Sequence, residues 1–210
     1  MMKLYGFGPL RSLRALWALQ EVDAEFEFVN VDIEGGENHR PAFLRLNPAG
    51  KIPVLVDGDL VLTESAAIVM YLAEKYPARE LLPADLAVRA DAYRWSLFTV
   101  TELEQPLQRI ALHTSAYPED RRLPEEIVLA KQDFAKMAAI LDRHMEGREF
   151  IVGDGITIAD CISAFVLDWA DEEGLLDGFL NMKDYLGRMY ARPKAPPRIA
   201  EASAREQANC

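Results

Sequence analysis

The sequence has little cysteine, no long apolar run and no excess of basic charge. Its two cysteines, Cys161 and Cys210, are too few for a disulfide framework to stabilise the fold. Charged residues interrupt every apolar stretch before the ~18 residues that a membrane-spanning helix needs, so we expect no membrane partner. The 34 acidic residues outnumber the 23 basic ones and give a formal net charge of −11. We therefore expect no nucleic-acid partner, because binding of that kind requires a basic face.

The remaining composition is that of an ordinary globular protein. Half of the 210 residues are hydrophobic and 27% are charged, which is typical of soluble domains. This length predicts one large domain or two small ones. The first residues, MMKLYGFG, lack the apolar core of a signal peptide, so we expect the protein to be cytoplasmic.

The first part of the chain alternates between strand and helix patterns. Short runs of β-branched and aromatic residues predict strands, the last two of them joined as a hairpin at Asp57-Gly58-Asp59, and apolar residues at helical spacing predict helices. The predicted elements are strands at 3–7, 26–32 and twice within 52–65, and helices at 11–21, 41–46 and 64–76. Their order is β-α-β-α-β-β-α.

The second part of the chain is helical throughout. The predicted helices are 86–115, 124–145, 155–170 and 182–191. We expect a kink at Pro106, which lacks a backbone donor, and a capping box at Thr157 and Asp160. Cys161 is expected to be a buried, inert thiol, and the small, polar tail at 200–210 to be frayed, with Cys210 a free thiol.

These patterns divide the chain near residue 80. The predicted domains are 1–77 and 86–210, joined by a linker at 78–85 that contains two prolines and no clear periodicity.

One candidate site combines the segments NPAGKIPVL and TES. Pro53 opens a strand and removes one ladder donor, so the backbone of Ile52 can pair with an extended peptide, and Lys51 offers a cation. Glu64 and Ser65 open the next helix, where backbone N–H groups and the helix dipole favour a bound carboxylate. A purely structural reading stays open, with Thr63 or Ser65 as the helix cap, Glu64 as a first-turn acid and Lys51 as a solvated charge.

These segments resemble the cytosolic glutathione transferase family. NPAGKIPVL and LTESAAIVMYLAEKY look like its glutathione-binding segment, and ITIADC and RMYARPKAPPRI are similar to parts of its helical domain. The resemblance covers about residues 3–200. It implies an α+β, thioredoxin-like N-terminal domain followed by an all-α C-terminal domain. It also implies a homodimer that uses glutathione as co-substrate and needs no metal, closest to bacterial, theta-like or beta-like members.

The resemblance further implies which residues bind glutathione. Glu64 and Ser65 would hold the γ-glutamyl end of the tripeptide. The backbone of Ile52, beside Pro53, would pair with the cysteinyl peptide, and Lys51 would meet the glycine carboxylate.

Two further positions correspond to sites of the family. Asn38 stands where members often have a histidine. Glu102 stands where an acid from the partner subunit often completes the γ-glutamyl site, although a solvated helix charge explains it equally well.

The thiol of glutathione must ionise before it can react, and a free thiol titrates near ~8.5. Family members stabilise the thiolate with a tyrosine or serine at the first strand–helix junction, or place a cysteine there, but these places hold Phe7, Leu10 and Arg11 here. Three alternatives stay open. Ser12 donates directly, Arg11 or the backbone N–H groups of the helix stabilise the charge, or the protein binds glutathione without activating it.

The expected activity is therefore conjugation of glutathione to small, largely apolar electrophiles, as in detoxification. The electrophile would lie between the Phe7–Leu10 loop and the helix at 86–115. The alternatives are a glutathione-dependent reductase, isomerase or dehalogenase on the same fold, or a non-catalytic regulatory protein. The lack of cysteine at position 11 weighs against a mechanism through an enzyme–glutathione disulfide.

Overall fold

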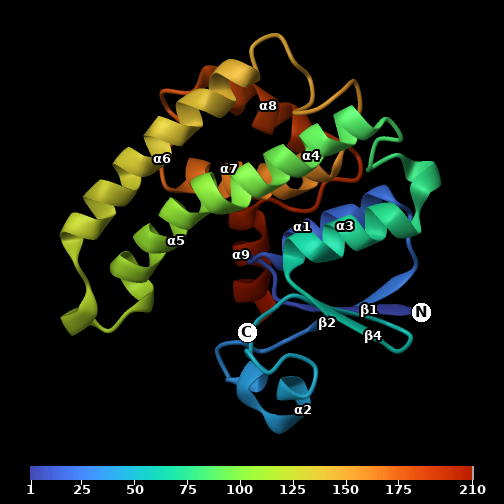
Figure 1. Cartoon of the computed structure of the whole chain (residues 1–210). Coiled ribbons are helices and arrows are strands. Elements are labelled where there is room, and N and C mark those ends of the chain that lie inside the picture. Colours follow the sequence, from blue (N-terminus) through green and yellow to red (C-terminus); the bar gives the residue numbers. More distant parts are fainter. Residues whose placement is uncertain (210) are drawn as a thin grey trace. The chain divides into compact units, whose positions relative to one another are not determined.

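The computed structural model describes residues 1–209, and its contacts divide the chain into two compact units. The first comprises Met1–Ala84 together with the segment from Tyr190 onward, and the second comprises Asp85–Met189. All the strands belong to the first unit (Figure 1). The first unit thus includes the residues after 189 as well as the sheet. The domain boundaries 1–77 and 86–210 stay a prediction.

A four-stranded mixed sheet in the order β2-β1-β3-β4 forms the centre of the first unit. Its strands are β1 (Met2–Gly6), β2 (Phe26–Asn30), β3 (Val54–Asp57) and β4 (Leu60–Thr63). β1 runs parallel to β2 and antiparallel to β3, and β3 and β4 form the predicted hairpin. Gly58 supplies the positive φ of 60° that the tight turn requires.

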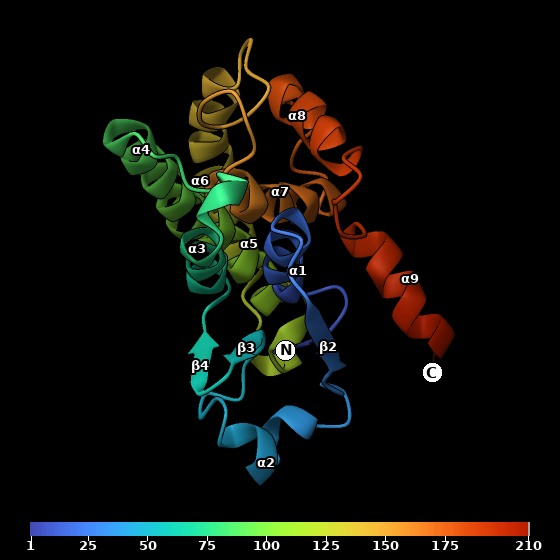
Figure 2. The same cartoon turned by 90° about the vertical axis from the view of Figure 1, so that its right-hand side faces the viewer.

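Helices cover both faces of this sheet. α1 (Ser12–Glu21) and α3 (Ser65–Lys75) pack together on one face, and the short α2 (Pro41–Leu44) lies on the other (Figure 2). Side chains of β1 alternate between the faces: Leu4 is buried, and Tyr5 meets Phe43 of α2 edge to face, with ring centroids 6.5 Å apart. Two 3₁₀ turns, Glu37–His39 and Pro77–Arg79, complete the unit. The predicted thioredoxin-like order is confirmed.

The segment after residue 189 is tied to α1. Both carboxylate oxygens of Glu21 accept hydrogen bonds from Arg192, each at 3.2 Å. Lys194 forms an ion pair with Asp23 at 2.6 Å. These contacts hold the approach to the last helix against the first one.

The last helix, α9 (Ile199–Asn209), replaces the predicted frayed tail. That prediction was wrong because the segment is rich in alanine, glutamate, arginine and glutamine, which favour a helix. Ala202 is buried, so α9 also packs on its surroundings. Cys210, predicted to be a free thiol, lies outside the described residues.

A buried helix, α7 (Ile158–Glu172), forms the core of the second unit and contacts α4 and α5. The other elements are α4 (Leu86–Phe98), α5 (Glu104–Ala111), the 3₁₀ turn Glu119–Arg121, α6 (Pro124–His144) and α8 (Leu180–Tyr190). The predicted capping box is present at the start of α7: Thr157 accepts from the backbone, and Asp160 accepts from the Thr157 N–H at 2.8 Å. This all-helical unit agrees with the predicted fold class.

The predicted continuous helix at 86–115 is interrupted twice. π-helical segments occupy Thr99–Leu103 and Leu112–Ala116, on either side of α5. The first lies just before Pro106, in the turn that a proline ring and its missing N–H disturb. The second contains no proline, and the sequence did not predict it. Within residues 1–209, no helix combines the length and hydropathy needed to cross a membrane.

Candidate functional site

The sheet register brings the predicted binding segments to one end of the strands, where β1 and β2 end and β3 begins. We call this end of the sheet the edge of the first unit. Val54 pairs with Thr63 across the hairpin, so the residues before β3 and after β4 lie at the same end. Val54 also pairs with Tyr5 of the antiparallel β1, which places the β1–α1 connection there too. Gly6 pairs with Asn30 of the parallel β2, so the loop after β2 leaves from this edge as well.

Two buried asparagines hold the turn before β3. Asn47 Nδ2 donates to the Lys51 carbonyl at 2.6 Å, and Asn38 Nδ2 donates to the Gly50 carbonyl at 2.7 Å. Gly50 has a φ of 63°, a conformation that glycine adopts without strain. Asn38 is only 7% exposed, and its Oδ1 has no hydrogen-bond partner among the described residues. Asn38 is therefore a buried residue that stabilises the turn, and its side chain is not exposed on the surface.

The residues that follow this turn expose backbone and a cation. The Ile52–Pro53 peptide bond is cis. The strand ladder begins only at Val54, so the partly exposed Ile52 lies outside it. The side chain of Lys51 is exposed. This edge can therefore receive an extended peptide through backbone hydrogen bonds, with a positive charge beside it.

The start of α3 has the features of an anion-binding helix end. Glu64 occupies the N-cap with φ 68° and ψ 108°, which costs a non-glycine residue about 1–3 kcal/mol. Its side chain is exposed and makes no capping hydrogen bond. The reading of Thr63 or Ser65 as the cap and of Glu64 as a first-turn acid is therefore wrong, because Glu64 itself occupies the cap position. Ser65 is buried, and its Oγ accepts from Arg14 Nη1 at 3.2 Å. The first turn of α3 contains no acidic residue to compete for its N–H groups.

Ser12, the first residue of α1, is buried inside the β1–α1 connection. Its exposed fraction is 0%, and its Oγ accepts a hydrogen bond from the Phe7 N–H at 3.1 Å. The hydroxyl retains its own hydrogen to donate. Arg11 is the N-cap residue of α1 and is partly exposed. Ser12 therefore stabilises the β1–α1 connection from a buried position, whereas Arg11 is accessible to solvent.

Two backbone amides at the start of α1 already have acceptors. The Leu13 N–H bonds to the Leu10 carbonyl at 3.0 Å, and the Arg14 N–H bonds to the Arg11 carbonyl at 3.2 Å. These tight turns use donors that a bare helix end would leave for a ligand.

The remaining predicted site residue, Glu102, belongs to the second unit. It is exposed in the π-helical segment, and its Oε1 accepts from Thr101 Oγ1 at 3.3 Å. Its role at a partner's glutathione stays a prediction. Cys161 is fully buried in α7, as expected for an inert thiol.

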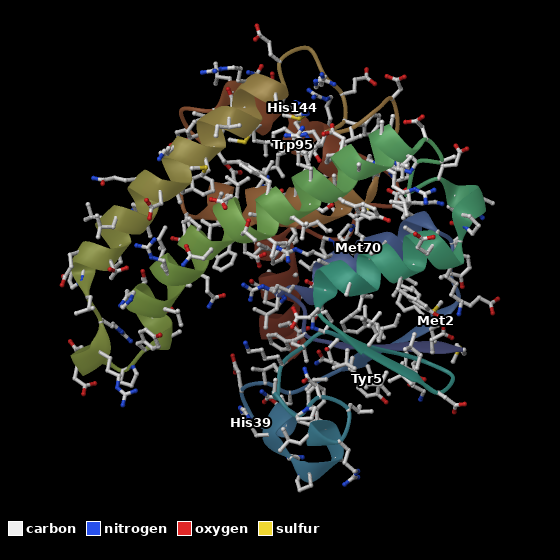
Figure 3. The ribbon with its side chains drawn as sticks, in the orientation of Figure 1. Met2, Tyr5, His39, Met70, Trp95 and His144 are labelled. Atoms are coloured by element: carbon white, nitrogen blue, oxygen red, sulfur yellow. The ribbon has the colours of Figure 1, made fainter. Side chains whose placement is uncertain are left out.

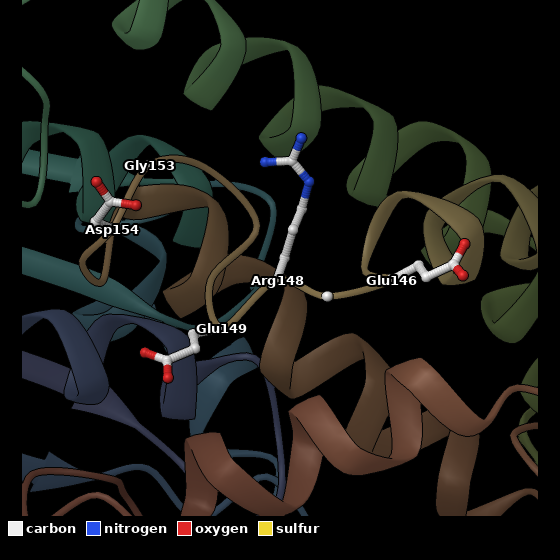
Figure 4. Close-up of a pocket in the computed structure, with 6 residues that line it drawn as sticks. Glu146, Arg148, Glu149, Gly153 and Asp154 are labelled. Carbon is white, nitrogen blue, oxygen red and sulfur yellow. The ribbon is translucent and has the colours of Figure 1, made fainter.

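A polar hollow of about 450 Å³ lies in the loops after α6. It is lined by Glu146, Gly147, Arg148, Glu149, Gly153 and Asp154. Figure 4 shows that its charged side chains splay apart instead of converging on one point. Among the described residues, no group of three or more histidine, cysteine, aspartate or glutamate side chains could hold a metal ion. The hollow therefore offers no convergent binding groups.

The sheet, its edge turn and the helix end at Ser65 define a thioredoxin-like domain that is followed in the chain by a helical unit. Residues 1–74 match the family model "Glutathione S-transferase, N-terminal domain", and residues 108–193 match "Glutathione S-transferase, C-terminal domain". The chain belongs to the glutathione S-transferase family.

Individual relatives come from plants and bacteria. "Glutathione S-transferase 1" of Dianthus caryophyllus is 39% identical over 78% of this chain and 74% of its own length. "Glutathione S-transferase GST-4.5" of Xanthomonas campestris pv. campestris is 31% identical over 90% of this chain and 93% of its own. A glutathione transferase family member from Pseudomonas fluorescens, solved with two glutathione molecules bound, is 26% identical, covers 96% of this chain and 91% of its own, and has a TM-score of 0.81.

Sequence reasoning missed three residues that support this edge. No sequence pattern distinguishes Arg14 from the other residues of its helix, although it reaches Ser65, 51 residues away. The role of Gly6 depends on a close contact with Ser12 that no sequence pattern reveals. Asn47 carried a usable signal, because asparagine before proline favours a turn.

Proposed function

We propose that this protein is a glutathione transferase that conjugates the thiolate of glutathione to small, largely apolar electrophiles. The observation that carries the proposal is the Val54–Thr63 pairing, which places the open backbone of Ile52 and the helix end at Ser65 on one edge. A γ-linked tripeptide needs this combination, an extended peptide partner together with an anion site for its terminal carboxylate. In the reaction, the sulfur forms a bond to the electrophilic carbon, and the leaving group departs with its electron pair.

The glutathione contacts follow from the same edge. Ser65 and the first N–H groups of α3 bind the γ-glutamyl carboxylate, and Glu64 receives the ammonium. The backbone of Ile52, set beside Pro53, pairs with the cysteinyl unit. Lys51 attracts the glycine carboxylate.

Asn38 and Glu102 are proposed to act on glutathione in two other ways. Asn38 acts by fixing the Lys51 turn through its bond to Gly50. Glu102 acts across a homodimer, where it would meet the partner's glutathione ammonium.

For the thiolate, we propose Arg11 as the main stabilising charge and Ser12 as the group that positions the connection. The burial of Ser12 and its bond to the Phe7 N–H support a positioning role for Ser12 and leave the stabilising charge to Arg11. A cation beside a thiol lowers its pKa. Direct donation from the Ser12 hydroxyl is the competing arrangement.

The test measures the ultraviolet absorbance of bound glutathione thiolate against pH. For the wild-type protein, the midpoint should lie well below the ~8.5 of a free thiol. Arg11→Ala should return the midpoint toward that value, and Arg11→Lys should restore part of the shift. If Ser12→Ala moves the midpoint more than Arg11→Ala does, the serine is the donor instead.

A glutathione-binding protein without activity is the second candidate, because Phe7 and Leu10 carry no hydroxyl at the usual places. A wild-type midpoint as high as that of free glutathione would support it. A glutathione-dependent reductase, isomerase or dehalogenase would instead show turnover with disulfides, isomerisable substrates or halogenated substrates.

We also propose a cytoplasmic homodimer of bacterial type, closest to theta-like or beta-like members. The similarity to the Xanthomonas campestris relative supports the bacterial assignment. Exposed leucines on α4 support the dimer, since Leu86 is 77% and Leu97 58% exposed. Sedimentation should show a dimer for the wild-type protein and a shift toward monomer for Leu97→Glu.

A further inference from the structure

The helix α9 brings a carboxylate to the connection between β1 and α1. A Cβ atom added at Gly8 would lie 2.9 Å from Oε1 and 3.0 Å from Cγ of Glu206. The Glu206 side chain therefore occupies the space that any larger residue at position 8 would need. Figure 2 shows α9 on the side of the sheet where this connection runs.

The position of α9 is fixed by the chain that leads to it. The double hydrogen bond from Arg192 to Glu21 and the ion pair of Lys194 with Asp23 tie this chain to α1. Ala202 anchors the helix itself by burial. Glu206 is partly exposed, so its charge faces both the connection and the solvent.

We propose that Glu206 is a specificity-determining residue that disfavours anionic groups on the glutathione sulfur. The inference rests on the proposed function, which places that sulfur at the β1–α1 connection. A substituent on the sulfur then lies near Gly8 and the Glu206 carboxylate. A negative charge on the substituent is repelled by Glu206, while a neutral group of the same shape is not. Arg11 lies in the same connection. Once the Glu206 charge is removed, the charge that remains near the sulfur substituent is therefore the positive charge of Arg11, which attracts an anionic group.

The test compares two glutathione derivatives of the same shape, S-(carbamoylmethyl)glutathione and S-(carboxymethyl)glutathione. Titration calorimetry gives the ratio of their dissociation constants for each protein. Glu206→Gln should shift this ratio toward the anionic derivative by about two- to tenfold, as expected for one unit charge at several ångströms near a protein surface. Because both derivatives share the glutathione part, effects of the variant on that part cancel in the ratio.

Two controls separate charge from structure. Glu201→Gln removes an exposed charge from the same helix and should leave the ratio unchanged. Gly8→Ala should displace the Glu206 side chain and shift the ratio in the same direction as Glu206→Gln, by a smaller factor. Added salt should reduce the discrimination of the wild-type protein more than that of Glu206→Gln.

The outcomes distinguish this inference from the proposed function. If both derivatives bind and the ratio is insensitive to Glu206→Gln, the inference is wrong and the glutathione site stands. If neither derivative binds the wild-type protein, the proposed function fails, and the inference fails with it.

Discussion

Arg14 Nη1 donates a hydrogen bond to Ser65 Oγ at 3.2 Å, and both residues are buried. The contact links the first turn of α1 with the first residue of α3, 51 positions later. It thereby joins the helix that would stabilise the sulfur, α1, to the helix that would hold the γ-glutamyl group, α3. One guanidinium thus supports both parts of the proposed site.

Replacing Arg14 by methionine should therefore weaken folding and glutathione binding together. The change leaves the buried Ser65 Oγ without this donor, which costs about 1–3 kcal/mol. Arg14→Lys should fall between, because lysine keeps the charge but not the planar fork. Urea unfolding and calorimetry with glutathione measure the two effects. Arg121→Met, at an exposed 3₁₀ turn, is the matched control and should stay within about 0.5 kcal/mol of wild type.

The sequence predicted the fold well because local signals and global packing agreed. The β-branched and aromatic residues of β2, the turn at Gly58 and the capping box at Thr157 each specify an element without reference to distant residues. The local geometry was predictable where a short motif determines it, as at Ile52, which precedes the strand ladder, and at Ser65, which begins α3. The role of these two residues in binding stays a prediction. The tail failed for a different reason: its polarity suggested a solvated, frayed end, although its alanine, glutamate, arginine and glutamine favour a helix and Ala202 packs that helix on its surroundings.

Asp160 should give the second unit an unusual dependence on pH. Its carboxylate accepts hydrogen bonds from the Ile151 N–H, from Thr157 and from the Tyr185 hydroxyl. Burial raises the pKa of Asp160 above its ordinary value of 3.8. The folded state then holds this proton more tightly than the unfolded state does. Its contribution to the free energy of unfolding therefore falls as pH rises through the window above 3.8.

Asp160→Asn should abolish that contribution and destabilise the protein by about 2–4 kcal/mol, because its amide NH₂ would face hydrogen-bond donors. The measurement is the urea midpoint as a function of pH. Asp154→Asn, at an exposed position in the preceding loop, serves as the control. Equal midpoints for Asp160→Asn and Asp154→Asn would contradict the role assigned to the buried carboxyl.

His144 should act in the opposite direction on acidification. Its ring lies against Trp95 with centroids 4.2 Å apart (Figure 3), and its Nε2 donates to the Ile151 carbonyl at 2.7 Å. Burial lowers the pKa of His144 below its ordinary value of 6.5. The unfolded state therefore takes up the proton first, and stability present above 6.5 is lost as pH falls through the lowered value.

His144→Gln should flatten this loss between neutral pH and mild acid, since glutamine can still donate to Ile151 but does not titrate. The check is the thermal midpoint of unfolding measured across that range without glutathione. His39→Gln, an exposed histidine of the first unit, should keep the wild-type slope. A slope for His144→Gln as steep as that of the wild type would assign the acid sensitivity to other groups.

Gly6 should be intolerant of even one methyl group, because its neighbour is a buried side chain that cannot move away. A Cβ at this position would lie 2.6 Å from Ser12 Oγ and 2.7 Å from Ser12 Cβ. Gly6→Ala should therefore cost about 1–3 kcal/mol, as overpacking does.

The rescue pattern identifies the cause of that cost. Ser12→Ala keeps the offending Cβ and should not restore stability to Gly6→Ala, whereas Ser12→Gly removes both close atoms and should restore part of it. The double variant Gly6→Ala with Ser12→Gly should then be more stable than the sum of the single changes predicts, by about 1 kcal/mol. Additive changes in the urea midpoint would mean that the contact is not the source of the strain. Because the Ser12 Oγ also accepts the Phe7 N–H, Ser12→Ala alone measures the loss of that hydrogen bond, separately from the steric contact with position 6.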